Sequence, residues 1–187
     1  RPTREDSTRR IRRGAIALRT QMILPVLNKS FEFSVPIVIV GAGACGICAA
    51  LTAQENGIDS LVLERDDAPT GSSALSTCLI PAAGTNLQRQ EGINDSPEAF
   101  AADLIAKAKN QNDPDMACWI ADASGPTVDW LVDTVGLPLS LVKGFKYPGH
   151  REFRMHGSPN RTGSELMAVL TDAVARMGLD LATSARV

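Results

Sequence analysis

The sequence is poor in aromatic residues and contains no long apolar run. Only 4% of its 187 residues are Phe, Trp or Tyr. No stretch reaches the roughly 18–20 consecutive apolar residues that a membrane-spanning helix requires. The hydrophobic fraction of 44% is nevertheless ordinary, and a chain of this length can bury a proper core. The composition therefore excludes a membrane span and predicts a globular domain.

A strong charge of one sign is also absent, since the formal net charge is −2. That small value hides an asymmetry. Residues 1–21 contain seven Arg against Glu5 and Asp6, which leaves a net charge of −7 on the remaining residues. An acidic body argues against nucleic acid as a partner. The Arg-rich start favours a basic, disordered or spurious leader over residues 1–30, with a targeting segment as the alternative.

Cysteine and histidine are scarce, with four and two residues respectively. Because no secretory apolar segment is evident, four cysteines indicate a reducing compartment and hence a cytoplasmic location. Cys45-Gly-Ile-Cys48 matches C-x-x-C, which can be a redox pair or half of a metal site. No second C-x-x-C or histidine pair completes a zinc set. We therefore expect no metal and interpret both cysteines as small buried residues.

The most informative stretch that is present runs from residue 35 to residue 57. Four apolar residues, Ile37 to Val40, predict a short strand buried on both faces. Gly41-x-Gly43-x-x-Gly46 follows directly, and an Ala-rich run of helical spacing then leads to Gly57, which can end a helix. The glycine pattern alone is a weak signal. The strand before it and the helix after it supply the context that a dinucleotide-binding turn requires.

Glu64 adds an acid at the expected distance. It ends the apolar run over residues 60–63 and lies 23 residues beyond Gly41, where a carboxylate that binds ribose is expected. Gly41 permits the tight turn, Gly43 lets the backbone approach a pyrophosphate, and Gly46 lets the helix pack closely on the strand. The helix N-terminus offers N–H groups and a partial positive charge. A glycine-rich turn in another kind of α/β protein is the alternative.

Two later segments look irregular. Residues 65–85 fit neither a helix nor a strand, and their small side chains and hydroxyls favour ligand contact over a plain surface loop. Residues 144–161 hold both histidines and several basic residues, which suit either an anionic ligand or a solvated loop. His156 is a candidate acid–base, a flavin neighbour or a structural donor, and no partner carboxylate can be placed beside it.

Helical and strand patterns fill the rest of the chain. Trp119 and Trp130 both lie at helical spacing and are interpreted as packing residues. Ser124-Gly-Pro126 is interpreted as a break between two helices. The elements expected are helices over residues 97–108, 114–123, 126–135 and 163–177, and strands over residues 139–142 and 179–187.

The motifs together resemble a known family. Residues 38–65 resemble an N-terminal FAD fingerprint, and residues 71–85 resemble the second FAD loop of the fumarate reductase/succinate dehydrogenase flavoprotein family. That family includes FAD-dependent 3-ketosteroid dehydrogenases. Asn160-Arg-Thr-Gly163 is similar to an Arg-Thr-Gly segment of the family. The resemblance covers about residues 33–187. One departure is that many members have a Gly-Gly pair where this chain has Cys78-Leu79.

The resemblance implies an α/β fold, a Rossmann-like FAD-binding domain of the glutathione-reductase type with a parallel sheet and inserted helices. Residues 31–187 would be its N-terminal part, with the substrate cap domain and the C-terminal part absent. No histidine occupies the position that links flavin covalently in succinate dehydrogenases, so the expected cofactor is non-covalent FAD. The residues assigned to FAD are Gly41, Ala42, Gly43, Cys45, Gly46, Glu64, Arg65, Ser72, Ser73, Thr77, Cys78 and Val187.

The implied activity is an FAD-dependent dehydrogenase or reductase acting on a CH–CH bond next to a carbonyl or carboxylate. Its partner would be a small-molecule substrate, either a carboxylate or a ketosteroid. The present chain, as the FAD-binding fragment, is expected to be inactive alone. The alternatives are an NAD-dependent Rossmann dehydrogenase and a nucleotide-binding module without catalysis.

Overall fold

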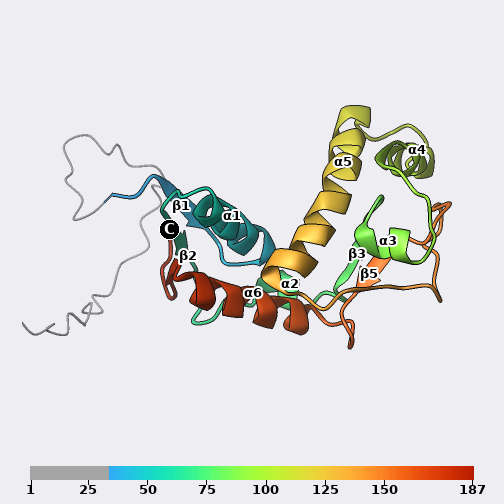
Figure 1. The fold of residues 1–187 in the computed structure, drawn as a ribbon. Coiled ribbons are helices and arrows are strands. Elements are labelled where there is room, and N and C mark those ends of the chain that lie inside the picture. The colour runs from blue at the N-terminus through green and yellow to red at the C-terminus, as the bar shows by residue number, and fades with distance from the viewer. Residues whose placement is uncertain (1–33) are drawn as a thin grey trace, which may run out of the picture. The chain divides into compact units, whose positions relative to one another are not determined.

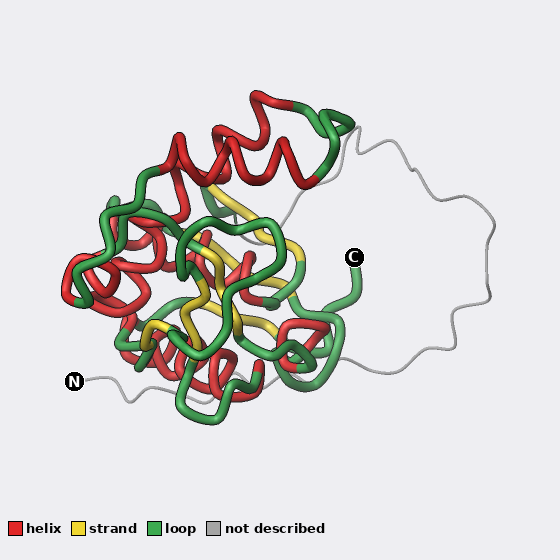
Figure 2. Tube along the Cα trace, turned by 90° about the vertical axis from the view of Figure 1, so that its right-hand side faces the viewer, coloured by secondary structure: helices red, strands yellow, loops and turns green. Residues whose placement is uncertain are grey.

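Two small sheets form the β-structure of residues 34–187, the part of the chain that the computed structural model describes. Residues 35–187 form one unit. Figure 1 shows the β1–β2 pair beside α1, and the β3–β5 pair apart from it on the side of α3 and α4. In Figure 2, strands are surrounded by helices and loops. The leader expected over residues 1–30 lies outside the described residues.

The first sheet is parallel and has the strand order β1-β2-β6. Its strands are β1 (Ile37–Val40), β2 (Ser60–Leu63) and β6 (Asp180–Ala182). Helix α1 (Ala44–Glu55) connects β1 to β2, and helix α6 (Gly163–Met177) leads into β6. The expected β–α–β unit around the glycine motif is therefore confirmed. The prediction that Ile37 to Val40 are buried on both faces is wrong, because Val38 and Val40 are exposed. The final strand is shorter than the sequence pattern suggested.

Helices α1 and α6 pack against each other and enclose the main core with β2. Both helices present small and branched apolar residues to this core, and for α6 this face follows the amphipathic pattern of the sequence. A glycine in the left-handed conformation follows α6 at Gly178, where the sequence pattern placed the helix end. The largest fully buried apolar side chains of these elements are Ile47, Leu51, Val62 and Leu170.

The second sheet is antiparallel and has the strand order β3-β5-β4. Its strands are β3 (Leu79–Pro81), β4 (Ser140–Leu141) and β5 (Met155–Gly157). Two short helices flank β3 in the sequence, α2 (Gly71–Ala74) and α3 (Asn86–Gln90). The structure thus gives regular elements to part of both segments that looked irregular in the sequence. The strand expected over residues 139–142 is confirmed in shorter form as β4, whereas β3 and β5, with three residues each, carried too little periodicity to be recognised.

Helix α4 (Pro97–Lys107) packs against helix α5 (Pro114–Trp130), and a π-helical turn, η1 (Leu131–Val135), continues α5. The expected break at Ser124-Gly-Pro126 is wrong, because α5 runs through it. The glycine packs against the backbone of Ala83, where a Cβ atom would overlap the Ala83 carbonyl oxygen. This close packing favours a continuous helix at a site where proline removes one helical hydrogen bond.

The outward face of α5 corrects a second interpretation. Trp119 was expected to pack in the interior, but it is 74% exposed, and its neighbours Met116 and Ile120 are also exposed. The buried face consists instead of the small residues Ala117 and Ala121, together with Gly125 and Val128. The apolar stripe in the sequence therefore lies on the exposed side of the helix, and close helix packing uses the small residues.

Candidate functional site

The glycine motif forms the turn between β1 and α1. Gly41 has φ of +97°, a left-handed conformation that glycine adopts without strain, and its N–H donates to the Leu63 carbonyl at 2.7 Å. A Cβ atom at Gly46 would overlap the carbonyl oxygen of Gly41, so no larger residue fits this approach of helix to strand. Gly43 is the N-cap of α1 and has no capping side chain. The close approach at this turn is therefore made by backbone atoms.

Several backbone N–H groups at this turn remain available. Among residues 34–187, the N–H groups of Gly43, Cys45 and Gly46 have no hydrogen-bond acceptor. The first N–H groups of any helix lack partners within the helix, and they carry the positive end of its dipole. A helix terminus with such free N–H groups is suited to an anion such as a pyrophosphate.

Glu64 joins the end of β2 to this turn. Its side chain is only 8% exposed, and its Oε2 accepts a hydrogen bond from the Ala42 N–H at 2.8 Å. The other carboxylate oxygen accepts from the Asp66 N–H at 2.9 Å. These N–H donors, of Asp66 first and Ala42 second, lower the pKa of Glu64 below its ordinary value. Each oxygen keeps a second acceptor site, so the ionised carboxylate can also accept from ligand hydroxyls.

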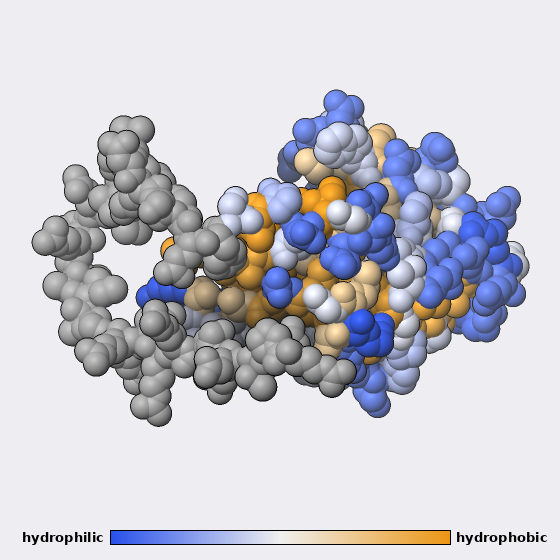
Figure 3. Space-filling model, turned by 60° about the vertical axis from the view of Figure 1, so that its left-hand side comes forward, coloured by the Kyte–Doolittle hydropathy of each residue, from blue (hydrophilic) through white to orange (hydrophobic). Residues whose placement is uncertain are grey.

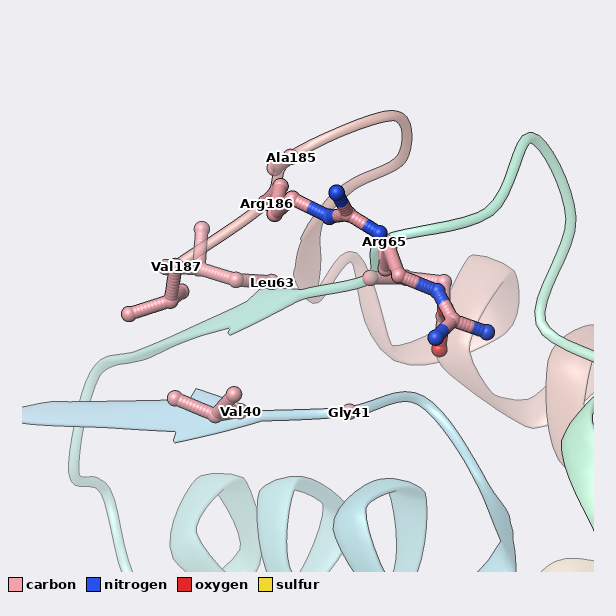
Figure 4. A pocket seen from close by; sticks show the side chains of 8 residues that line it. Val40, Gly41, Leu63, Arg65, Ala185, Arg186 and Val187 are labelled. Atoms are coloured by element: carbon pink, nitrogen blue, oxygen red, sulfur yellow. The ribbon is translucent and has the colours of Figure 1, made fainter. Parts of the chain in front are cut away.

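A pocket of about 430 Å³ opens beside Glu64 at the carboxyl ends of the parallel strands. Figure 4 shows the labelled lining residues, which come from the end of β1, the end of β2 and the segment after β6. Crevices at the carboxyl ends of parallel strands are where open α/β sheets bind their ligands. The lining residues are Val40, Gly41, Leu63, Glu64, Arg65, Ala185, Arg186 and Val187.

The pocket contains both predicted and unpredicted residues. Gly41, Glu64, Arg65 and Val187 were assigned to FAD from the sequence, and the structure brings them together. Arg186 was missed, because a lone arginine after a short strand has no distinguishing pattern. Arg65 is exposed, and its Nε pairs with the Asp66 carboxylate at 3.0 Å.

The second loop meets the glycine turn through Ser73. Its Oγ accepts a hydrogen bond from the Ala44 N–H at 3.1 Å, at the first turn of α1. The loop is also fixed to α6, because the Gly163 N–H donates to the Ser76 carbonyl at 2.7 Å. A Cβ atom at Gly163 would overlap the Ser73 carbonyl oxygen. Two regions that lie far apart in the sequence are therefore held against each other at the site.

The remaining loop residues assigned to FAD differ in exposure. Ser72 and Thr77 are exposed, whereas Cys78 is buried. Cys78 has φ of +49°, a left-handed conformation that costs a residue with a Cβ atom roughly 1–2 kcal/mol. In the flavoprotein family whose second FAD loop this segment resembles, many members have glycine at this position. The left-handed conformation explains why glycine suits it.

Cys45 and Cys48 differ from their interpretation as buried residues. Cys45 is exposed and Cys48 is partly exposed, so that interpretation is wrong for Cys45. Both cysteines line an open, mainly apolar groove between α1, β1 and α5, which also includes Ile37 and Trp130. Figure 3 shows apolar surface, in orange, on the side of the molecule to which β1 and α1 belong.

His156 lies away from the glycine turn, on β5. It is completely buried, its Nε2 is 2.9 Å from the Thr85 Oγ1, and its Nδ1 is 3.2 Å from the Ile80 carbonyl oxygen. Because that carbonyl can only accept, Nδ1 carries the proton and Nε2 accepts from the threonine hydroxyl. Burial lowers the pKa of His156, which favours the neutral ring. Both nitrogens are thus occupied in linking β5 to β3 and α3.

Most basic residues in and next to the 144–161 segment form ion pairs with carboxylates. Arg154 is fully buried between Asp95 and Asp103, with contacts of 2.6 Å to each. Arg151 also binds Asp103, and Lys143 binds Glu91 at 2.7 Å. These ion pairs favour a structural role for the segment over the anionic-ligand alternative.

Comparison with known proteins identifies the class of this site. The FAD binding domain family matches residues 36–187, and the chain belongs to this family. The cofactor indicated is FAD, in preference to the NAD alternative.

Individual relatives share the same part of the fold. Urocanate reductase of Eggerthella lenta is 28% identical over 152 residues, which are 81% of this chain and 25% of that protein. The open conformation of a flavocytochrome c3 fumarate reductase has a TM-score of 0.73 at 28% identity, covering 80% of this chain and 26% of the other. The 3-ketosteroid-Δ4-(5α)-dehydrogenase of Rhodococcus jostii RHA1 has a TM-score of 0.71 at 25% identity, covering 85% and 39%. The chain spans about a quarter of the first two proteins.

The described residues contain no helix that is both long and apolar enough to cross a membrane.

Proposed function

We propose that this chain is the FAD-binding part of an oxidoreductase acting on a CH–CH bond next to a carbonyl or carboxylate. The relatives named for fumarate, urocanate and ketosteroids support this, because those compounds carry a carboxylate or a carbonyl group. The observation that carries the proposal is the position of Glu64 against the glycine turn at the open ends of β1 and β2.

The residues present fit the cofactor. The N–H groups of Gly43, Cys45 and Gly46 would bind the pyrophosphate, and the Glu64 carboxylate would accept from the adenosine ribose hydroxyls. Val187 would lie near the adenine. Ser72, Ser73, Thr77 and Cys78 would line the pyrophosphate and flavin. When bound, FAD supplies the hydride-transfer chemistry.

Non-covalent attachment is supported by the composition of the second loop, because residues 71–85 contain no histidine. The first part of the same loop is anchored to two helices, by the Ser73 hydroxyl to α1 and by the Ser76 carbonyl to α6. A rigid loop of small residues lets the backbone approach a flat ring system without a side chain intervening.

We also propose that the 187-residue chain alone does not turn over substrate. Its one named acid–base candidate, His156, is buried and hydrogen-bonded at both nitrogens, so it cannot meet a substrate proton without disrupting the fold. Small-molecule substrates and an electron partner would be bound by other parts of the intact protein. Four free thiols support the proposed cytoplasmic location.

The test is FAD affinity of the chain, measured by equilibrium dialysis, with ADP as a competitor that shares the ribose and pyrophosphate. Glu64→Gln is expected to weaken FAD binding by about 10- to 100-fold, because charge-assisted bonds to the ribose are lost. Asp59→Asn is the matched control, since this exposed carboxylate lies outside the site and should leave affinity unchanged. Circular dichroism checks that both variants fold.

Two results would contradict the proposal. Unchanged affinity in a folded Glu64→Gln variant would remove the ribose assignment. Binding of NAD by a chain that does not bind FAD would remove the flavoprotein function itself.

A further inference from the structure

Two thiols lie together at the first turn of α1. Cys45 and Cys48 are three residues apart in this helix, and residues with that spacing share a face. Both side chains line the same groove, Cys45 exposed and Cys48 partly exposed. The proposed FAD function gives the pair of thiols no role, since it uses only the backbone of Cys45.

The helix geometry lets the two residues form a disulfide. The rise and radius of an α-helix place Cα atoms three residues apart at about 5 Å, within the range of disulfides. Their Cβ atoms start about 5–6 Å apart, whereas a disulfide needs about 3.5–4.5 Å, so the first turn must tighten by about 1 Å. Gly46 lies between them and adds no side chain. A bond that needs such tightening is strained and therefore easily reduced again.

The two sulfurs are not equivalent. Burial, and secondly the nearby charge of Cys45, raise the pKa of Cys48 to about 11, so this thiol is protonated near neutral pH. Cys45 is the more accessible sulfur and is the one that an external reagent meets first.

We propose that Cys45 and Cys48 form a reversible thiol–disulfide exchange site for small disulfides such as glutathione disulfide. The Cys45 thiolate attacks one sulfur of glutathione disulfide, forming a mixed disulfide and releasing one glutathione, which takes up a proton. Cys48 then loses its proton and attacks the Cys45 sulfur, which displaces the second glutathione. The chain is oxidised by two electrons, and glutathione disulfide is reduced to two thiols.

The other two cysteines provide internal controls. Cys118 is exposed on α5, outside the groove that Cys45 and Cys48 share, and Cys78 is buried in the second loop. If exposure alone decided the chemistry, Cys45 and Cys118 would behave alike. If pairing decides it, only Cys45 loses its glutathione adduct to attack by a neighbouring thiol.

The experiment treats the reduced chain with glutathione disulfide, quenches with an alkylating reagent and maps the products by peptide mass spectrometry. We expect a Cys45–Cys48 disulfide that dithiothreitol reverses, and a stable glutathione adduct at Cys118. Cys48→Ser and Cys48→Ala should both accumulate the glutathione adduct at Cys45. Cys45→Ser should lose the internal disulfide, and Cys118→Ser should retain it.

The proposal is overturned if the native chain carries equal glutathione adducts at Cys45 and Cys118 without an internal disulfide. An internal disulfide that involves Cys78 or Cys118 overturns it as well. Because no FAD is used, these outcomes are independent of the proposed cofactor function.

Discussion

The two sheets of this chain are held together in different ways. The parallel sheet packs on α1 and α6 through small and branched apolar residues and through close backbone contacts at glycines. Its one buried acid, Glu64, is satisfied by backbone N–H groups. The antiparallel sheet adjoins a fully buried arginine, Arg154, which binds Asp95 and Asp103. One region relies on backbone shape and the other on paired charges.

The difference shows which contacts a sequence pattern can reveal. Glu64 contacts Ala42, 22 residues away, inside a motif whose spacing is recognisable. Arg154 contacts Asp95 and Asp103, which lie 59 and 51 residues away in segments with no common pattern. In the sequence, Arg154 therefore looked like one more basic residue of an irregular loop.

The largest expected effect is the loss of the buried arginine. Arg154→Met removes the partner of two buried carboxylates, and breaking such a pair typically costs about 3–5 kcal/mol. Urea unfolding measures the change in the free energy of unfolding. Arg151→Met is the matched control, because its side chain is 61% exposed and its ion pair should contribute about 1 kcal/mol or less. Equal losses in the two variants would contradict a special role for the buried pair.

The second expected effect is a difference in stability between alanine substitutions at two glycines of the same motif. Gly46→Ala should destabilise the chain by about 3 kcal/mol, because the new methyl group overlaps the Gly41 backbone, which cannot move away cheaply. Gly43→Ala should be much milder, since its Cβ atom would meet only the Ser73 Oγ at an ordinary 3.4 Å. Thermal unfolding of both variants provides the comparison. If Gly43→Ala were the more damaging, the assignment of the close contact would be wrong.

FAD affinity measures a second consequence of the Gly43→Ala substitution. Gly43→Ala places a methyl group where the pyrophosphate should approach the backbone, so it should weaken FAD binding while the chain remains folded. Unchanged affinity in this folded variant would contradict that placement of the pyrophosphate.

The sequence was sufficient to predict the main elements of the first region. The β–α–β unit around Gly41–Gly46, the acid at Glu64 and the amphipathic helix α6 all follow patterns of apolar spacing and capping that act over short distances. The FAD family was also reached from the sequence, through the motif and the second loop together. Local signals were strong there because the turn needs particular residues at particular positions.

In the second region the sequence predicted helix α4 and the position of β4, but the other elements lay beyond these signals for physical reasons. Strands β3 and β5 have three residues each, so their pairing depends on contacts rather than on periodicity. Pro126 was interpreted as a break because tertiary packing of Gly125 on Ala83 cannot be seen in one sequence. For the pocket, Arg186 was missed because only the fold brings the segment after β6 next to β2.

A smaller effect is expected at His156. Replacing it by Leu leaves the buried Thr85 O–H without its acceptor and removes the ring N–H donor from the Ile80 carbonyl, at a cost of about 1–3 kcal/mol. Its lowered folded-state pKa also has a consequence for pH. Between the ordinary value of about 6.5 and the lower folded value, the unfolded chain binds more protons, so stability falls as pH falls through that window.

Urea unfolding at a series of pH values measures this dependence. The native chain should lose stability as pH falls below about 6.5, and His156→Leu should lose less over the same range. His150 also has a lowered pKa, but it is present in both proteins and does not change the comparison. Identical pH profiles would show that His156 does not titrate differently in the folded chain.

The smallest effect is expected at Trp119, where sequence and structure disagree most. Its side chain is 74% exposed on α5, so Trp119→Gln should change the free energy of unfolding by no more than about 0.5 kcal/mol. Phe100 on α4 is the contrasting aromatic residue. It is 1% exposed, its ring lies 4.8 Å from the Arg154 guanidinium carbon, and Phe100→Ala should cost about 3–5 kcal/mol. A loss at Trp119 comparable with that at Phe100 would show that the tryptophan is covered by packing, as the helical spacing alone suggested.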